Sequence, residues 1–227
     1  MEFTIAETNG NSTALRFEPK ELIIAGWTGR DQAIVQAHIR ELEELGVAAP
    51  ATTPVFYRVA ASRLTTAAKI QVTGTNTSGE VEIVLIRADG ELFVGTGSDH
   101  TDRDAEAIGV TLSKQLCDKP WAKTIWRYAD VESHWDDLRL VSRIGAGGET
   151  YQEGTAAEML TPADLLSRYE AAHSGFADGM VMFCGTLPVI GGLRPSDRFV
   201  YELYDPKLER RIESAYETRL LPVAEAQ

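Results

Sequence analysis

The sequence has only two cysteines, Cys117 and Cys184, and they stand 67 positions apart. That spacing does not match a zinc site, and the sequence gives no ground for pairing the two thiols. We therefore expect both to be free and reduced, as in a cytoplasmic protein.

The sequence also lacks a block of basic residues, a long apolar run and a secretory leader. It holds 22 Lys and Arg against 34 Asp and Glu, a net charge of −12 at pH 7, which disfavours nucleic acid and anionic lipid as partners. No apolar run reaches the roughly 20 residues that span a bilayer, and the N-terminus has no charged region followed by an apolar one. We expect a cytoplasmic protein that binds neither nucleic acid nor membranes.

Internal repeats and low-complexity segments do not occur either, and the composition is that of a soluble globular protein, with 44% hydrophobic and 25% charged residues. A chain of 227 residues is long enough to bury roughly 70% of its unfolded surface. The sequence predicts an N-terminal extension or hairpin over residues 1–21 and one domain over residues 22–227.

Alternating apolar and polar residues indicate many short strands, beginning with a hairpin whose strands FTIAE and ALRFE are joined by the turn NGNS. Three segments have helical signals, residues 31–45, 102–117 and 161–173. Thr28 is the expected cap of the first, and the second places Ile108, Leu112 and Leu116 on one apolar face. Because strands and helices do not alternate regularly, the sequence predicts an α+β fold dominated by a mixed, rolled β-sheet.

The segment GEVEIVLI has the pattern of a strand with two apolar faces, one of which also carries Glu80 and Glu82. An unpaired buried carboxylate costs on the order of several kcal/mol, and a divalent cation would compensate this pair. Asp99 follows the next apolar run in a glycine-rich turn, where it could add a third oxygen ligand. Carboxylates without a nearby cysteine indicate a site for a hard cation, and the small number of protein ligands favours Mg²⁺ over Ca²⁺, because it leaves room for water and substrate oxygens. The alternative is a solvated strand face with Asp99 as an ordinary turn residue.

A second candidate site is the pair His38 and Glu41 on the first helix. Residues three apart are neighbours on a helix surface, so the carboxylate is within reach of the imidazole. A carboxylate that holds one ring nitrogen makes the other a better proton acceptor, which activation of water requires. The alternative is a histidine half-buried against the core with an incidental glutamate.

Three motifs occur in order: GEVEIVLI, then DHTDRD with the form Asp-x-Thr-x-Arg-Asp, then Ser113-Lys114. Together they resemble the fumarylacetoacetate hydrolase superfamily. The resemblance continues in GETYQEGTAAEMLTPADLLSRY and MVMFCGTLPVIGGLRPSDRFVYEL, over residues 148–169 and 180–203. It implies the mixed β-roll of that family with a few short helices, and it implies a homodimer.

The resemblance also assigns the metal ligands. In that family the residues that match Glu80, Glu82 and Asp99 hold Mg²⁺ or Mn²⁺. Asp102 and Asp104 are alternative third ligands in this sequence.

Further roles follow from the same resemblance. Lys114 faces the substrate, Arg103 binds an anionic substrate group or orients a metal-binding carboxylate, and Thr186 with its backbone amide binds the substrate carboxylate. The segment HIREL is similar to the lid helix of the acylpyruvase branch, in which the dyad that matches His38 and Glu41 activates the hydrolytic water.

The activity that the resemblance implies is that of a metal-dependent hydrolase. It would cleave a carbon–carbon bond in a small anionic 1,3-dioxo or 2-oxo carboxylate, acylpyruvate-like, through a metal-bound enolate. A 2-oxo acid decarboxylase, hydratase or isomerase is an alternative, because these reactions share the enolate. A catalytically inactive binding protein on the same fold is another, supported by the short interval between Glu82 and Asp99 and by Val59-Ala60-Ala61-Ser62 in the place where the family has Lys-Pro after a strand. The sequence does not identify the acyl chain.

Overall fold

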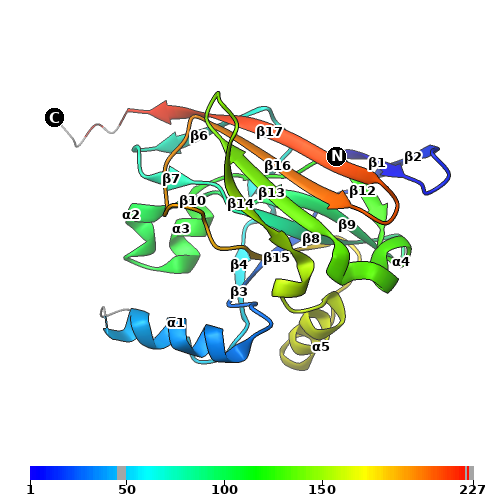
Figure 1. The fold of residues 1–227 in the computed structure, drawn as a ribbon, viewed down its shortest axis with the longest axis horizontal. Coiled ribbons are helices and arrows are strands. Elements are labelled where there is room, and N and C mark those ends of the chain that lie inside the picture. The colour runs from blue at the N-terminus through cyan, green and yellow to red at the C-terminus, as the bar shows by residue number, and fades with distance from the viewer. Residues whose placement is uncertain (45–49, 223, 225–227) are drawn as a thin grey trace.

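The computed structural model of the protein describes residues 1–44, 50–222 and 224, with the exception of the side chains of residues 38 and 41–44. Its strands form two large sheets and two short ribbons. In Figure 1 the five-stranded sheet lies above the eight-stranded sheet, and helices α1 (Gln32–Glu44) and α5 (Pro162–Ala172) lie below both. The fold is the strand-rich α+β architecture that the sequence predicts.

The eight-stranded sheet is mixed and has the order β2-β1-β12-β9-β8-β15-β3-β4. Two of its pairs, β1 with β12 and β15 with β3, are parallel, and its other pairs are antiparallel. Its strands are β1 (Glu2–Ala6), β2 (Ser12–Arg16), β3 (Glu21–Gly26), β4 (Val55–Val59), β8 (Val81–Ala88), β9 (Glu91–Ser98), β12 (Thr124–Arg127) and β15 (Met180–Thr186). The predicted N-terminal hairpin is confirmed as β1 and β2, and it joins the edge of this sheet through β12.

The five-stranded sheet has the order β14-β13-β16-β17-β6. Its strands are β6 (Lys69–Thr73), β13 (Arg139–Ile144), β14 (Glu149–Thr155), β16 (Arg198–Asp205) and β17 (Arg210–Leu221). The two ribbons pair β7 (Thr77–Ser78) with β10 (Thr101–Asp102) and β5 (Leu64–Thr65) with β11 (Lys119–Pro120).

The core lies on both faces of β8, because its side chains alternate between two buried clusters. Ile83 and Leu85 belong to a cluster that also contains Tyr201 of the five-stranded sheet. Val84 lies in a second cluster with Phe3 of the N-terminal hairpin. The prediction of a strand with two apolar faces is therefore confirmed, and β8 is one of the central strands of its sheet.

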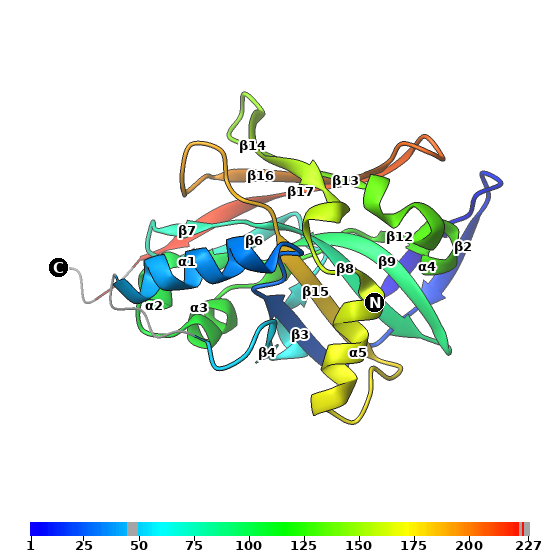
Figure 2. The ribbon, with the colours of Figure 1, turned by 60° about the horizontal axis from the view of Figure 1, so that its bottom comes forward.

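The remaining helices are short. They are α2 (Arg103–Glu106), α3 (Val110–Leu116), α4 (Tyr128–Val131) and the 3₁₀ turns η1 (Ala61–Arg63), η2 (Glu132–Asp137) and η3 (Ala156–Glu158). Figure 2 shows α1 crossing at the ends of β3 and β15. No helix among the described residues is long and apolar enough to cross a membrane.

The predicted cap of α1 is wrong. Asp31 caps this helix, because its Oδ1 accepts hydrogen bonds from the backbone amides of Ala33 at 2.9 Å and Ile34 at 3.3 Å. Thr28 is buried instead and lies four residues before the helix starts.

The single helix predicted over residues 102–117 is also wrong, since α2 ends at Glu106 and α3 begins at Val110. Its supposed core face points to solvent, with Ile108 81% exposed and Leu116 49% exposed. The inward side of α3 carries Ser113 and Lys114. An apolar stripe predicts the buried face of a helix only when no polar side chain of that helix has a charged partner in the core. Here Lys114 has such a partner, the buried carboxylate of Asp99.

Candidate active site

The hairpin of β8 and β9 brings three carboxylates together. Glu80 directly precedes β8, Glu82 belongs to it, and Asp99 directly follows β9. The Asp99 backbone amide donates to Glu80 O at 3.0 Å, which ties the ends of the two strands. One oxygen of each carboxylate lies within 4.8 Å of the others. We call Glu80, Glu82 and Asp99 the carboxylate cluster.

The carboxylate cluster is not the solvated strand face considered above, because two of its members are buried. Glu82 is 2% exposed and Asp99 is fully buried. Of the alternative ligands, Asp102 caps α2 by accepting from the Ala105 amide at 3.0 Å, and Asp104 accepts from Asn76 Nδ2 at 2.7 Å. Asp99 is therefore the third member.

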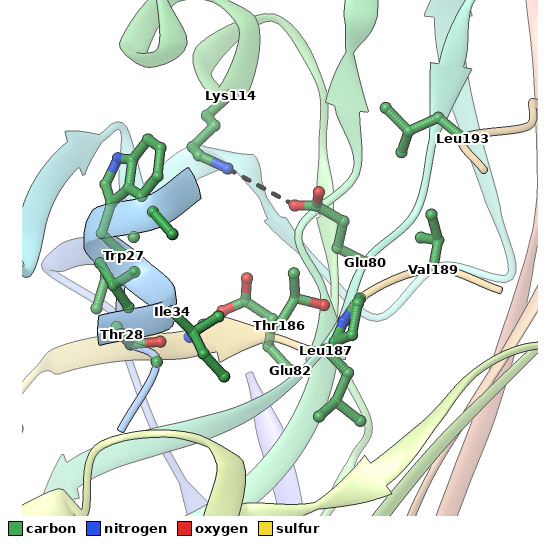
Figure 3. Close-up of a pocket in the computed structure, with 17 residues that line it drawn as sticks. Trp27, Thr28, Ile34, Glu80, Glu82, Lys114, Thr186, Leu187, Val189 and Leu193 are labelled. Carbon is green, nitrogen blue, oxygen red and sulfur yellow. Dashed lines mark hydrogen bonds and ion pairs between the residues drawn. The ribbon is translucent and has the colours of Figure 1, made fainter. Parts of the chain in front are cut away.

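Three cationic side chains surround the cluster. Lys114 donates to Asp99 Oδ2 and lies 3.8 Å from Glu80 Oε2 (Figure 3). Lys119 Nζ lies 3.0 Å from Asp99 Oδ1 and donates to the His100 carbonyl oxygen. Arg103 donates to Glu80 Oε1 at 2.9 Å. The cations thus gather on Asp99 and Glu80.

Arg103 donates from all three of its guanidinium nitrogens and does not line the pocket. Its guanidinium donates to Ser78 Oγ at 2.8 Å and to Glu106 Oε2 at 3.1 Å, in addition to Glu80. Burial lowers the pKa of Arg103, but Glu80 and Glu106 outweigh it and raise the pKa above its usual range. Of the two roles that the sequence left open, these contacts favour orientation of a carboxylate over binding of substrate.

The carboxylates are compensated unequally. Burial opposes ionisation of Asp99, but Lys114 and Lys119 outweigh it and lower its pKa to about 2. Burial, and then the charge of Asp99, raise the pKa of Glu82 well above its usual range. Within the described part of the chain, Glu82 has no lysine or arginine at ion-pair distance, and Asp99 Oδ1 accepts no well-aligned hydrogen bond. Such a set of hard oxygen donors suits a divalent cation.

Gly185 supports Glu82 from the end of β15. Its amide donates to Glu82 Oε2 at 2.8 Å. Its φ of +98° lies in a region that glycine adopts readily, and a Cβ at this position would lie 1.8 Å from Thr28 Oγ1. Glycine is thus required both by the backbone angle and by the close packing of buried Thr28.

Gln152 is a supporting residue that sequence reasoning missed. Its Nε2 donates to Thr186 Oγ1 and to Leu187 O, each at 2.7 Å, and its Oε1 accepts from the Val81 amide at 2.9 Å. The Thr186 hydroxyl in turn donates to Val81 O at 2.9 Å. The hydroxyl proton of Thr186 is therefore already engaged, and the predicted contact of Thr186 with a substrate carboxylate stays a prediction.

Lys119 was also missed. It is fully buried, and the only signal in the sequence is a lysine followed by the apolar residues Pro120 and Trp121. A lysine is almost never fully buried without a partner, so a lysine in an apolar context is the pattern by which such a residue can be found.

A pocket of about 670 Å³ opens above the carboxylate cluster. Glu80, Glu82 and Lys114 line it, and Thr186 lies on its wall (Figure 3). Helix α1 contributes Ile34, Val35 and Ala37 to the lining. The structure therefore brings Glu80, Glu82, Asp99, Lys114 and Thr186 together, as predicted. The side chains of His38 and Glu41 lie outside the described residues, so their predicted role stays a prediction.

Lys119→Met is expected to lower the free energy of unfolding by about 3–5 kcal/mol, because removing one partner of a buried ion pair leaves the other uncompensated. Chemical denaturation of the metal-free protein measures this change. Lys69→Met is the matched control, since it breaks a pair with Glu217 of 2.8 Å whose lysine side chain is 71% exposed. Equal midpoints for both variants would contradict the assigned role of Lys119.

Solved structures share this arrangement of strands. The yeast protein ynq8, a fumarylacetoacetate hydrolase family protein, is 18% identical with a TM-score of 0.61, over 90% of this chain and 95% of the other. A candidate fumarylpyruvate hydrolase from Burkholderia cenocepacia is 19% identical with a TM-score of 0.62, over 98% and 96%. A 2-keto-3-deoxy-D-arabinonate dehydratase is 17% identical with a TM-score of 0.62, over 89% and 74%.

These similarities, with the strand order described above, define the fold as that of the fumarylacetoacetate hydrolase family, and they confirm the resemblance seen in the sequence at the level of fold. A comparison with curated proteins finds no match. The model of the family described as "Protein of unknown function (DUF2848)" matches residues 25–216, and the chain belongs to this family.

Proposed function

We propose that the protein is a divalent-metal-dependent enzyme that hydrolyses a carbon–carbon bond in a 2,4-dioxo carboxylate of the acylpyruvate kind. One observation carries the proposal: two members of the carboxylate cluster, Glu80 and Glu82, line a pocket large enough for a small molecule, together with Lys114. A purely structural cluster would have no need of a pocket. The ligand type and the small number of protein ligands favour Mg²⁺ or Mn²⁺.

When bound, the metal supplies a Lewis acid that polarises substrate oxygens. Glu80, Glu82 and Asp99 are the residues that would hold it. Arg103 keeps Glu80 in place, and the Gly185 amide does the same for Glu82.

The chain's own residues supply the rest of the reaction. His38, oriented by Glu41, takes a proton from water, and the water oxygen bonds to the C4 carbonyl carbon of the substrate. The C3–C4 bond then breaks and its electron pair stays on the pyruvate fragment. The positive charge of Lys114 stabilises the negative charge that forms on this fragment. The proton that His38 took from water passes to C3, which completes pyruvate and a carboxylic acid. The backbone amide of Thr186 is the proposed donor to the substrate carboxylate.

The test is a substrate panel with the Mg²⁺-loaded protein and with the protein in EDTA, followed by NMR. Conversion of acetylpyruvate to pyruvate and acetate, dependent on metal, is the expected result. Loss of CO₂ from oxaloacetate or hydration of 2-oxopent-4-enoate, without cleavage of acetylpyruvate, would assign one of the alternative reactions. A protein that binds metal but converts no member of the panel would be a binding protein on this fold.

His38→Gln is expected to reduce kcat by about 100-fold, because a general base contributes roughly 10²–10⁴-fold. Metal affinity, measured by calorimetry, should stay unchanged, since this residue is not a proposed ligand. His173→Gln replaces an exposed histidine at the end of α5 and serves as the control. Full activity of His38→Gln would remove the dyad from the proposal.

We also propose, from the resemblance alone, that the active form is a homodimer in the cytoplasm. Sedimentation velocity of the purified protein measures the oligomeric state, and a monomer across the micromolar range would contradict it.

A further inference from the structure

The pocket above the carboxylate cluster adjoins a second cavity, with which it shares lining residues and which we call the second lobe. The second lobe has a volume of about 610 Å³ and extends toward Met159 and Ala157 at η3. The residues common to both cavities are Gly29, Ile34, Val35, Thr186, Leu187 and Pro188. A ligand fixed at the carboxylate cluster therefore has the second lobe next to it, beyond these shared residues.

Apolar side chains line the route between the two cavities. Ile34 lies on one side and Leu187 on the other, and Figure 3 shows both beside Thr186 and Glu82. Ile34 is 67% exposed although it is a large apolar residue. Met159 continues the apolar lining at the far end. Such a surface gains free energy from an apolar ligand group.

The charged residues of the second lobe are already engaged. Arg30 donates to both carboxylate oxygens of Asp136, each at 2.7 Å, and to Met159 O at 2.9 Å. Asp31 caps α1, and Glu158 Oε1 accepts from the Thr155 amide at 3.0 Å. Among the described residues that line the two cavities, Lys114 is thus the one cation near the cluster. In its described part, the second lobe has no cation without a partner that could pair with a second carboxylate of a ligand.

The charge at the carboxylate cluster leads to the same conclusion. Its three carboxylates and Glu106, which also pairs with Arg103, exceed the three cations Arg103, Lys114 and Lys119 by one negative charge. A bound divalent cation would then leave one positive charge for the substrate. The carboxylate of a 2-oxo acid matches that charge, and a second carboxylate on the remote chain has no charge left to match.

We infer that the substrate bears an uncharged apolar chain of several carbons on the side remote from its carboxylate, and that the second lobe binds this chain. The inference rests on the proposed function, because the proposed metal centre fixes the other end of the molecule. Substrates with a second carboxylate at the remote end are rejected, since an unpaired carboxylate would have to leave water for an apolar surface.

Binding of 2-oxo acids that are not cleaved tests the inference without any turnover. Calorimetry of the Mg²⁺-loaded protein would compare 2-oxobutanoate, 2-oxohexanoate and 2-oxooctanoate. Each buried methylene is expected to tighten binding about 3- to 4-fold, so 2-oxooctanoate should bind about 100-fold more tightly than 2-oxobutanoate. The diacid 2-oxoadipate, with six carbons, should bind at least about tenfold more weakly than 2-oxohexanoate. Equal affinities along the series, or tighter binding of the diacid, would overturn the inference.

Ile34→Asp places a carboxylate at the entrance to the second lobe. It is expected to fold, because Ile34 is exposed and an acidic residue in the first turn of a helix is favourable. The affinity ratio between 2-oxooctanoate and 2-oxobutanoate should fall below about tenfold in this variant. Leu208→Asp is the matched control, since Leu208 is 39% exposed in the turn between β16 and β17 and lines neither cavity. A ratio that survives in Ile34→Asp would place the chain elsewhere and overturn the inference.

The outcomes separate this inference from the proposed function. A gain with chain length, without cleavage of any 2,4-dioxo acid, supports the subsite and contradicts the hydrolase. Cleavage without such a gain supports the hydrolase and contradicts the subsite. No binding of any 2-oxo acid contradicts the subsite together with the metal centre on which it depends.

Discussion

Glu82→Gln is expected to weaken Mg²⁺ binding by more than about 100-fold, because even residues that only support metal ligands contribute roughly 10–100-fold. Glutamine keeps an acceptor for the Gly185 amide, so the local hydrogen bond of 2.8 Å is retained while the charge is lost. Calorimetry of metal-stripped protein measures the affinity directly. Thermal unfolding gives a second readout, since a metal that binds only the folded state raises the midpoint of the wild type and leaves that of the variant unchanged.

The matched control for this experiment is Glu202→Gln. Glu202 is a buried glutamate of the five-stranded sheet, where it pairs with Arg211 at 3.4 Å and does not line the pocket. It should bind one Mg²⁺ per chain with the affinity of the wild type. If Glu82→Gln binds the metal as well as this control does, the proposed metal centre is wrong and the catalytic proposal is wrong with it.

Lys114→Met is expected to separate metal binding from activity. Lys114 donates to Asp99 Oδ2, an oxygen of one of the carboxylates that would hold the metal, and it brings a positive charge next to the cluster. Its removal should tighten Mg²⁺ binding by at least about tenfold, since a unit charge near 4 Å is worth about 4 kcal/mol at an intermediate dielectric. Activity should nevertheless fall by about 1,000-fold, because a preorganised positive group is lost from the reaction.

Tighter metal binding together with lower activity distinguishes this role of Lys114 from a structural one. A lysine that only held Asp99 in place would, on removal, weaken metal binding and activity together. Lys207→Met, at an exposed lysine in the turn between β16 and β17, controls for the loss of a positive charge from the protein as a whole. Weaker metal binding in Lys114→Met would therefore assign Lys114 to the support of Asp99 alone.

The carboxylate cluster was predictable from the sequence because it depends on local pattern. Alternation along β8 places Glu82 between buried apolar residues, and the short interval to Asp99 is the length of a hairpin. The pairing of Val81 with Ser98 brings the neighbours of Glu80 and Asp99 side by side. Predicting that two adjacent strands form an antiparallel hairpin requires no knowledge of the rest of the fold.

Contacts that join distant parts of the chain were not predictable in this way. Gln152 lies 71 positions from Val81, whose amide it holds, and nothing in the local pattern at either position indicates the other. The exposed face of α3 shows the same limit. Periodicity pointed Leu116 inward, whereas the buried charge on Asp99 draws Lys114 inward instead. Which face of α3 is buried depends on the energy of the Lys114–Asp99 pair, and the helical periodicity of the sequence carries no information about that energy.

The hairpin also sets the order in which the site can assemble during folding. The carboxylate cluster lies within residues 80–99 of the chain, whereas its covering parts, α1 and the segment after Gly185, come from the first fifth and the last fifth. Contacts between near neighbours in sequence close small loops and form early, and contacts between distant segments follow. The hairpin that carries the carboxylate cluster should thus acquire protection from hydrogen exchange before the segments that cover it. A cation present during refolding would then meet its proposed ligands before the pocket is enclosed.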